Sequence, residues 1–211
     1  MKKVLLCLCA FVLCTSVGVS QTQTWIGLGP SLSVKPGVNM SDIPDKHKTG
    51  LTVVVPDFGA TLLMSLKNVK LGVMLDLGYN TSKVLDKPND GATDENTDIT
   101  SIHYFNIGPS FTYSGILIGL NYGIPLSGDT TNKAGTKVRE FPNTDNVNSL
   151  LELRFGGTIP LVEDPTGRFC ITIMGNYMLS SLYKDYDKPV NNPTIGSISV
   201  GFSYLFTISN Q

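Results

Sequence analysis

VKLGVMLDLGY, residues 69–79, alternates large apolar side chains with small or charged ones along its whole length. One face carries large apolar residues, namely Val69, Leu71, Val73, Leu75, Leu77 and Tyr79. The opposite face carries the small or charged residues Lys70, Gly72, Asp76 and Gly78. Because successive side chains of a β-strand point to opposite faces, this period of two predicts a strand with one continuous apolar face.

The same alternation recurs along the rest of the chain. We expect seven further strands, at 25–34, 56–66, 102–113, 116–126, 151–161, 169–181 and 198–208. Tight turns at 67–68, 114–115 and 163–167 follow the even-numbered strands, while long connections follow the odd-numbered ones. This rhythm predicts an all-β protein, an eight-stranded antiparallel up-and-down transmembrane β-barrel with short periplasmic turns and four extracellular loops.

The first twenty residues have the pattern of a secretory signal peptide. Lys2 and Lys3 precede an apolar run at 4–14, and small residues at 18–20 mark a cleavage site. We therefore expect a signal peptide over 1–20 and an outer-membrane barrel over 21–211. Acylation of Cys14 is a weaker alternative, because Leu13 stands where a lipoprotein signal has a small residue. Of the four cysteines, only Cys170 lies outside the signal, which excludes an internal disulfide.

Charge is distributed unevenly, although the net charge is only −1. Charged residues gather in the segments 35–50, 80–98, 127–148 and 183–194, which we expect to be the extracellular loops. A soluble β-protein places charges along the wet faces of its strands, so this distribution favours the membrane barrel over a soluble barrel or sandwich. Nothing in the charge pattern indicates a nucleic-acid partner.

The apolar faces must be outside if lipid surrounds the barrel, because a closed barrel leaves no backbone edge unpaired in hydrocarbon. Aromatic residues near the strand ends predict an interfacial girdle of Trp25, Tyr79, Tyr113, Phe169, Tyr183, Tyr204 and Phe206. The polar faces then form a lumenal network of Asp57, Lys70, Asp76, Asn106, Asn121, Glu152, Arg154 and Asn176.

Pairing across a turn at 67–68 puts Asp57 and Asp76 near the same height, where Arg154 can supply a positive charge from a strand roughly opposite. An eight-stranded barrel is just wide enough for side chains to fill it. A structural ion-pair plug is the favoured interpretation, with a ligand or ion site in the lumen as the alternative. On the opposite faces, we expect Ile118→Arg to impair assembly and Gly119→Ser to be mild.

Three segments carry a family resemblance: VKPGVNMS at 34–41, YFNIGPSFTYSG at 104–115 and IGLNYGIPLSG at 118–128. They resemble the Bacteroidetes outer-membrane β-barrel family, porin-like or PorT-like, which is similar in architecture to small OmpA- and OmpX-type barrels. The resemblance implies an outer-membrane location and no known activity. The last strand, ISVGFSYLFTI at 198–208, resembles the strand that the barrel-assembly machinery reads, which implies that machinery as a partner during insertion.

No residue constellation predicts catalysis or a metal site. The acidic segment 80–98 fails the EF-hand spacing at Pro88 and Thr97, and no group visibly orients His103 beside Ser101. We therefore expect a monomeric non-enzyme without cofactor or metal, in contact with outer-membrane lipid and lipopolysaccharide. The favoured function is a surface scaffold, adhesion or binding element that acts through its loops, and the alternative is a narrow channel for small or apolar solutes.

Overall fold

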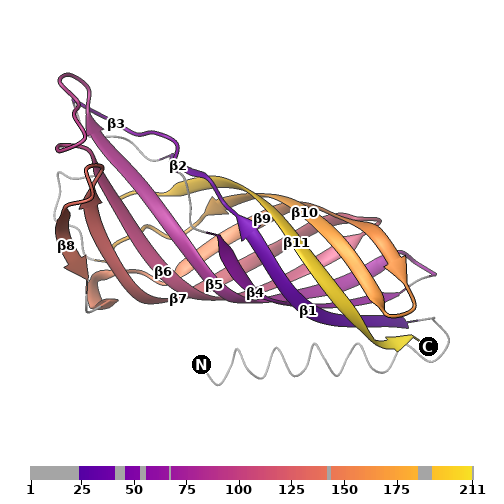
Figure 1. Ribbon diagram of the computed structural model, residues 1–211. Helices are drawn as coiled ribbons and strands as arrows, with labels where there is room; N and C mark the ends of the chain where they lie inside the picture. Colours follow the sequence, from indigo (N-terminus) through magenta and orange to yellow (C-terminus); the bar gives the residue numbers. More distant parts are fainter. Residues whose placement is uncertain are drawn as a thin grey trace.

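Eight long strands form the body of the protein. The computed structural model describes residues 24–40, 46–52, 56–66, 68–141, 144–184 and 192–210. The eight strands are β1 (Thr24–Val34), β4 (Asp57–Leu66), β5 (Leu71–Pro88), β6 (Asp98–Tyr113), β7 (Ile116–Asn132), β9 (Leu150–Asp164), β10 (Gly167–Met178) and β11 (Ile195–Asn210). Each pairs antiparallel with the next, and the pairing of β11 with β1 closes the ring (Figure 1). The predicted eight-stranded antiparallel barrel is confirmed.

Among the described residues, three short strands and one 3-10 turn lie at the end of the barrel with the long connections. β2 (Gly37–Asn39) pairs with β11 where β1 has ended, β3 (His47–Lys48) pairs with β5, and β8 (Lys137–Phe141) pairs with β7. A single 3-10 turn, η1 (Thr144–Asn146), precedes β9. The described residues include no helix with the length and hydropathy that a membrane-spanning helix requires. The predicted signal peptide at 1–20 lies outside the described residues.

The two faces of the wall differ as the alternation predicts. On β7, Ile118, Leu120 and Tyr122 point outward and Ile118 is 53% exposed, whereas Leu117 and Asn121 point inward and are buried. Large exposed apolar side chains of the same kind occur on each of the eight strands. The outer wall is therefore apolar, the reverse of a water-soluble barrel.

The β4–β5 turn is longer than predicted, and this changes the pairing. β4 ends at Leu66 and β5 begins at Leu71, with Leu66 opposite Leu71. Lys70 has a positive φ of 53° and is exposed in the turn, where its carbonyl accepts the amide hydrogen of Ser114. The prediction that Lys70 lies in the lumen is wrong, because the strand begins one residue after it.

The longer turn also shifts the register of β4 against β5 by two residues. Asp76 lies opposite Thr61, while the backbone amide of Thr81 donates to Asp57. The prediction that Asp57 and Asp76 lie near the same height is therefore wrong, since Asp57 lies four residues from Thr61 along β4, closer to the long connections.

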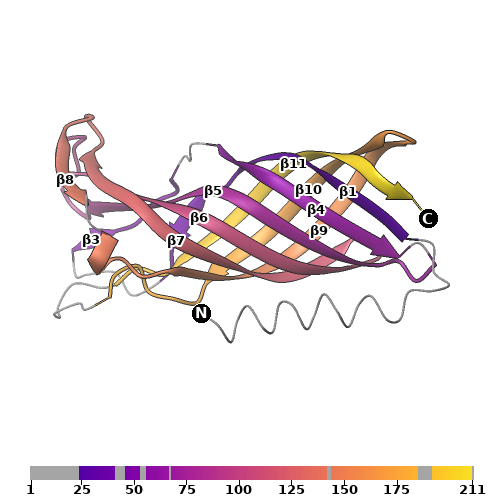
Figure 2. The same ribbon diagram turned by 90° about the horizontal axis from the view of Figure 1, so that it is seen from below.

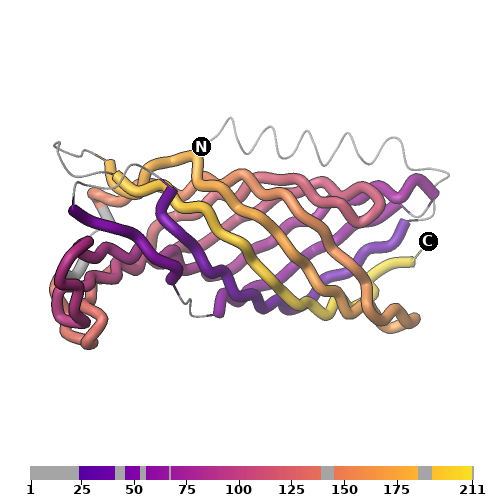
Figure 3. Tube along the Cα trace, turned by 90° about the horizontal axis from the view of Figure 1, so that it is seen from above, coloured from indigo at the N-terminus to yellow at the C-terminus, as the bar shows by residue number. Residues whose placement is uncertain are grey.

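Strands β5, β6 and β7 continue well past the rest of the barrel. The expected loop 80–98 is mostly a hairpin, with pairing that runs to Asp86 opposite Asp98, and β7 carries β8 on its far side. These strands rise as one curved sheet beyond the barrel rim (Figures 1 and 2). In the view from above, the tilted strands wrap the barrel and the extension leaves it on one side (Figure 3).

The β9–β10 turn at the opposite end is pinned by one side chain. Asp164 accepts hydrogen bonds from the hydroxyl and amide of Thr166 and from the amide of Gly167. These donors, the Thr166 hydroxyl first, hold the pKa of Asp164 below its ordinary value. The stabilisation is therefore present above the ordinary Asp pKa and is lost as the pH falls through the lowered value.

Candidate functional site

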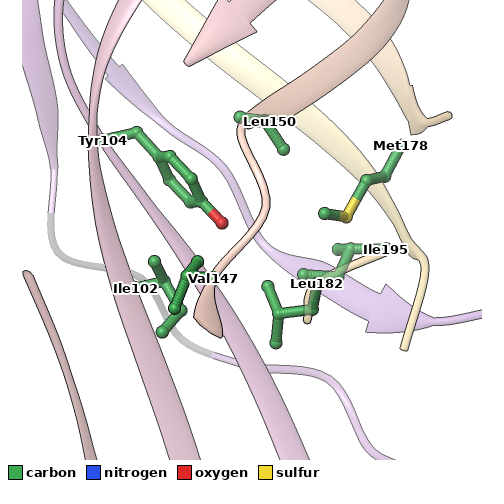
Figure 4. Close-up of a cluster of buried hydrophobic side chains, with 7 residues drawn as sticks. All are labelled: Ile102, Tyr104, Val147, Leu150, Met178, Leu182 and Ile195. Carbon is green, nitrogen blue, oxygen red and sulfur yellow. The ribbon is translucent and has the colours of Figure 1, made fainter. Parts of the chain in front are cut away.

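The barrel interior is built in three layers. An apolar cluster, the cap cluster, closes the end with the long connections, and consists of Ile102, Tyr104, Val147, Leu150, Met178, Leu182 and Ile195 (Figure 4). A second apolar cluster, the inner cluster, fills the end with the short turns and consists of Trp25, Leu63, Met74, Leu117, Cys170, Met174 and Leu205. Polar and charged side chains occupy the space between them.

Two connections fold inward to make the cap cluster. The segment before β9 supplies Val147, and the segment after β10 supplies Leu182. The amide of Asn148 donates to the carbonyl of Leu182, and the Asn148 side chain donates to Ser181 and Tyr183, so the two connections are tied together. Loops that sequence alone places in solvent therefore bury apolar side chains over the barrel mouth.

Two members of the predicted aromatic girdle lie elsewhere. Trp25 is 2% exposed within the inner cluster, where its indole N–H donates to Thr207 and the Arg168 guanidinium lies 3.9 Å from its ring centroid. Trp25 shares the inward face of β1 with Ser31 and Ser33. Its position in the alternation therefore places it inside the barrel and not on the outer wall. Tyr183 packs against the cap cluster, because its segment folds over the barrel mouth. The girdle prediction is wrong for both.

The other predicted girdle residues lie on the outer wall. Tyr113 and Phe206 are exposed near the short turns, and Tyr204 packs edge-on against Phe206. Phe169 stacks on Phe202, and Tyr79 stacks between Phe58 and His103 toward the long connections. Stacked rings at both ends of an apolar wall suit the two polar boundaries of a bilayer.

Two ion pairs hold the polar layer together. Arg154 Nη1 lies 2.8 Å from Asp76 Oδ2, and the Thr61 hydroxyl donates to the other carboxylate oxygen of Asp76 at 2.6 Å. Lys35 Nζ lies 3.2 Å from Glu152 Oε1, while Asn121 donates to Glu152 Oε2 at 2.7 Å. Both oxygens of each carboxylate are therefore matched with donors, as burial in a low-dielectric interior requires.

Lys35 was missed by the sequence argument, which placed it in an extracellular loop. Its side chain is 5% exposed and also donates to Asn80 at 2.8 Å. The alternation of the first strand could have predicted its position, because Lys35 continues the series of inward-facing residues Ser31 and Ser33. The predicted strand ends at Val34, one residue before Lys35, whereas β2 resumes pairing with β11 at Gly37.

A polar chamber of about 110 Å³ lies within this layer. Of the predicted network, Asp57, Asp76, Asn106, Asn121, Glu152, Arg154 and Asn176 line it. Asn176 donates to Ser197 and Ser199 on the neighbouring strand. Oδ2 of Asp57 and Oδ1 of Asn106 are buried and accept no hydrogen bond from the residues that the structure describes. In the described part of the chain, no group of three or more His, Cys, Asp or Glu side chains could hold a metal ion.

Gly119 lies where two strands approach closely inside the barrel. A β-carbon there would lie 2.1 Å from the Ser110 hydroxyl oxygen and 2.5 Å from the Pro109 carbonyl oxygen. We expect Gly119→Ser to destabilise the barrel by about 1–3 kcal/mol through overpacking, measured by urea unfolding in detergent. The mild effect expected from the sequence is thus revised. Gly175→Ser is the matched control, since its β-carbon has only one neighbour, 3.7 Å away; equal losses in both would contradict the assignment.

Comparison with known proteins finds structural likeness only. No family model matches the chain, and no curated protein matches it. Among solved structures, the chain is similar to Ail, the attachment invasion locus protein of Yersinia pestis, at 14% identity over 88% of this chain and 99% of that one, with a TM-score of 0.34. It is also similar to Neisserial surface protein A, at 9% identity over 85% and 96% of the two chains, with a TM-score of 0.37.

The outer membrane protein OprG from Pseudomonas aeruginosa is a third similar structure, at 13% identity over 88% of this chain and 96% of that one, with a TM-score of 0.32. Likeness at this level says nothing of a shared ligand or partner. The Bacteroidetes assignment stays a prediction.

Proposed function

We propose that this protein is a sealed, non-enzymatic outer-membrane β-barrel whose extended strands form a scaffold, adhesion or binding surface outside the cell. The apolar outer wall supports the membrane location, since large exposed apolar side chains on every strand are stable only against hydrocarbon. Outer-membrane lipid and lipopolysaccharide would surround that wall, and the barrel-assembly machinery would insert it. In bacterial barrels the short turns face the periplasm, so the β5–β6–β7 extension would face outward.

The filled interior is the observation that carries the sealed state. The cap cluster, the ion-paired polar layer and the inner cluster follow one another along the barrel axis. A permanent solute path would have to break buried contacts in each layer, which disfavours the narrow channel. His103 offers no support for an enzyme, because its ring stacks on Tyr79 and its Nδ1 lies 3.2 Å from the Thr81 hydroxyl.

The extension is the feature best suited to contact a partner. His47 pairs with Asp86 at 2.7 Å, Lys133 pairs with Asp94 at 2.7 Å, and the hydroxyls of Thr100 and Thr130 lie 3.0 Å apart across two strands. These side-chain contacts and the strand pairing hold a polar surface in a defined shape beyond the barrel rim. Preorganised surfaces lose less conformational entropy on binding than flexible loops do.

Planar-bilayer recording tests whether the barrel is sealed. We expect the refolded chain without residues 1–20 to insert without steady single-channel conductance, because buried side chains of the described residues occupy each of the three layers. A general-diffusion porin inserted in the same bilayers is the positive control for the recording. Steady openings, with an ion selectivity that changes in Arg154→Ala, would contradict the sealed barrel and favour the channel.

Cysteine labelling on intact cells tests location and orientation. The only cysteine among the described residues, Cys170, is buried, so a single introduced cysteine can report alone. We expect a membrane-impermeant maleimide to label Lys87→Cys, in the extension, on intact cells, and to label Lys70→Cys, in a short turn, only after lysis. Labelling of Lys70→Cys first would reverse the orientation, and recovery of the protein in the aqueous fraction would refute the membrane location.

A further inference from the structure

The charges that line the polar chamber do not balance. Among the described residues, three carboxylates line it, from Asp57, Asp76 and Glu152, but only two cations, Lys35 and Arg154. Arg154 is bound to Asp76, and Lys35 is bound to Glu152. Asp57, which is 6% exposed, is therefore left with one negative charge that no cation from the described part of the chain contacts directly.

Hydrogen bonding leaves Asp57 incomplete in the same way. Its Oδ1 accepts the backbone amide of Thr81 at 2.9 Å, whereas its Oδ2 has no donor. Asn106 Oδ1 lines the same chamber and also lacks a donor. Both orphaned atoms are acceptors, so they are complementary to a positively charged group. A buried charge without a partner is costly, because it has lost its hydration without gaining an opposite charge.

The chemistry of the chamber selects a small monovalent cation over a divalent one. Calcium takes six to eight oxygen ligands with several carboxylates among them, and transition metals prefer histidine or thiolate. The described residues hold no cluster of that kind. One excess negative charge with a carboxylate oxygen and an amide oxygen matches a single positive charge with oxygen ligands, and a chamber of about 110 Å³ has room for a cation and water.

We propose that the polar chamber is a binding site for one small alkali cation, of which sodium is the physiological example. The Asp57 carboxylate is the charged ligand of this cation. Asn106 supplies a neutral oxygen to the same chamber. The cation completes the ion-pair layer, so that three carboxylates face three positive charges. This site is a structural addition to the sealed barrel and requires no transport.

The test is thermal unfolding of the refolded barrel in detergent, with sodium chloride titrated against choline chloride at constant ionic strength. We expect the melting temperature of the wild-type protein to rise saturably with sodium, on the order of 2–4 °C, because a ligand that binds only the folded state stabilises it. Asp57→Asn should abolish the response while keeping a melting temperature in choline at or above the wild-type value. Broadening of the sodium-23 resonance by wild-type protein, absent with Asp57→Asn, should accompany it.

Asp94→Asn is the matched control, because Asp94 is an exposed carboxylate paired with Lys133 and should keep the full sodium response. A wild-type melting temperature that does not depend on sodium would overturn the proposal and would indicate a protonated Asp57. An equal sodium response in wild type and Asp57→Asn would overturn it as well. If Asp57→Asn does not refold, Asn106→Leu with weakened sodium-23 broadening replaces it. Steady conductance in bilayers would refute the sealed barrel but leave this measurement intact, so the two failures are distinguishable.

Discussion

Ile118→Arg should destabilise the barrel by about 1–3 kcal/mol in lipid and reduce its assembly in cells, because the cost of a charged side chain on a lipid-facing wall rises with its depth in the bilayer. Ile118 is outward-facing in the part of β7 near the short turns, the third residue of the strand, between Phe111 and Phe155 on the neighbouring strands. An arginine there places its charge between two aromatic side chains of the apolar wall. Urea unfolding in vesicles and the yield of the heat-modifiable folded form measure the two effects.

Ser127→Arg is the control for that substitution, on the same strand. Ser127 is exposed and lies opposite His103, toward the long connections, where the wall meets the polar boundary. The expected cost there is about 0–1 kcal/mol. If both variants lost the same stability, or if Ile118→Arg were harmless in lipid, the outer wall would not face hydrocarbon.

Lys35→Met should destabilise the barrel by about 3–5 kcal/mol, the cost of leaving a buried charge without its partner. Of the described cations, the variant removes the only one that contacts Glu152, and Asn80 loses the Lys35 donor as well. Glu152 would then face the chamber without its ion-pair partner. Equilibrium unfolding in urea, with circular dichroism and gel mobility as independent probes, measures the loss.

Two further variants distinguish the effect of breaking a buried ion pair from the effect of replacing any lysine. The double variant Lys35→Met/Glu152→Gln should recover most of the stability, because it removes both charges of the pair. Lys133→Met breaks an ion pair of similar geometry, but one in which the side chains are 56% and 64% exposed, so its cost should be about 0–1 kcal/mol. Equal costs for Lys35→Met and Lys133→Met would show that burial does not strengthen the pair.

The fold could be predicted because the alternation is local and is repeated on every strand. A period of two assigns each residue to a face, and short turns assign each strand a direction. Most of the lumenal residues followed directly, including Asp57, Glu152 and Arg154. Two of the wrong predictions have local causes. The residue type of Trp25 suggests the interfacial girdle, although its position in the alternation places it on the inward face. The prediction for Lys70 assumes a two-residue turn, whereas the turn is longer and includes Lys70. A one-residue error in where a strand begins moves a side chain from the lumen to solvent.

The amino-acid sequence by itself determined the closed barrel, its apolar outside and the identity of most polar residues within it, because those properties depend on neighbours along the chain. Only the tertiary structure decided the rest: the inward fold of two connections over the barrel mouth, the recruitment of Lys35 to Glu152, the extension of three strands beyond the rim, and the unpaired Asp57. Each of these depends on side chains far apart in sequence, such as Lys35 and Glu152, that meet only when ring closure sets the register of all eight strands. No local pattern encodes that register, since it follows from the turns and the closure together.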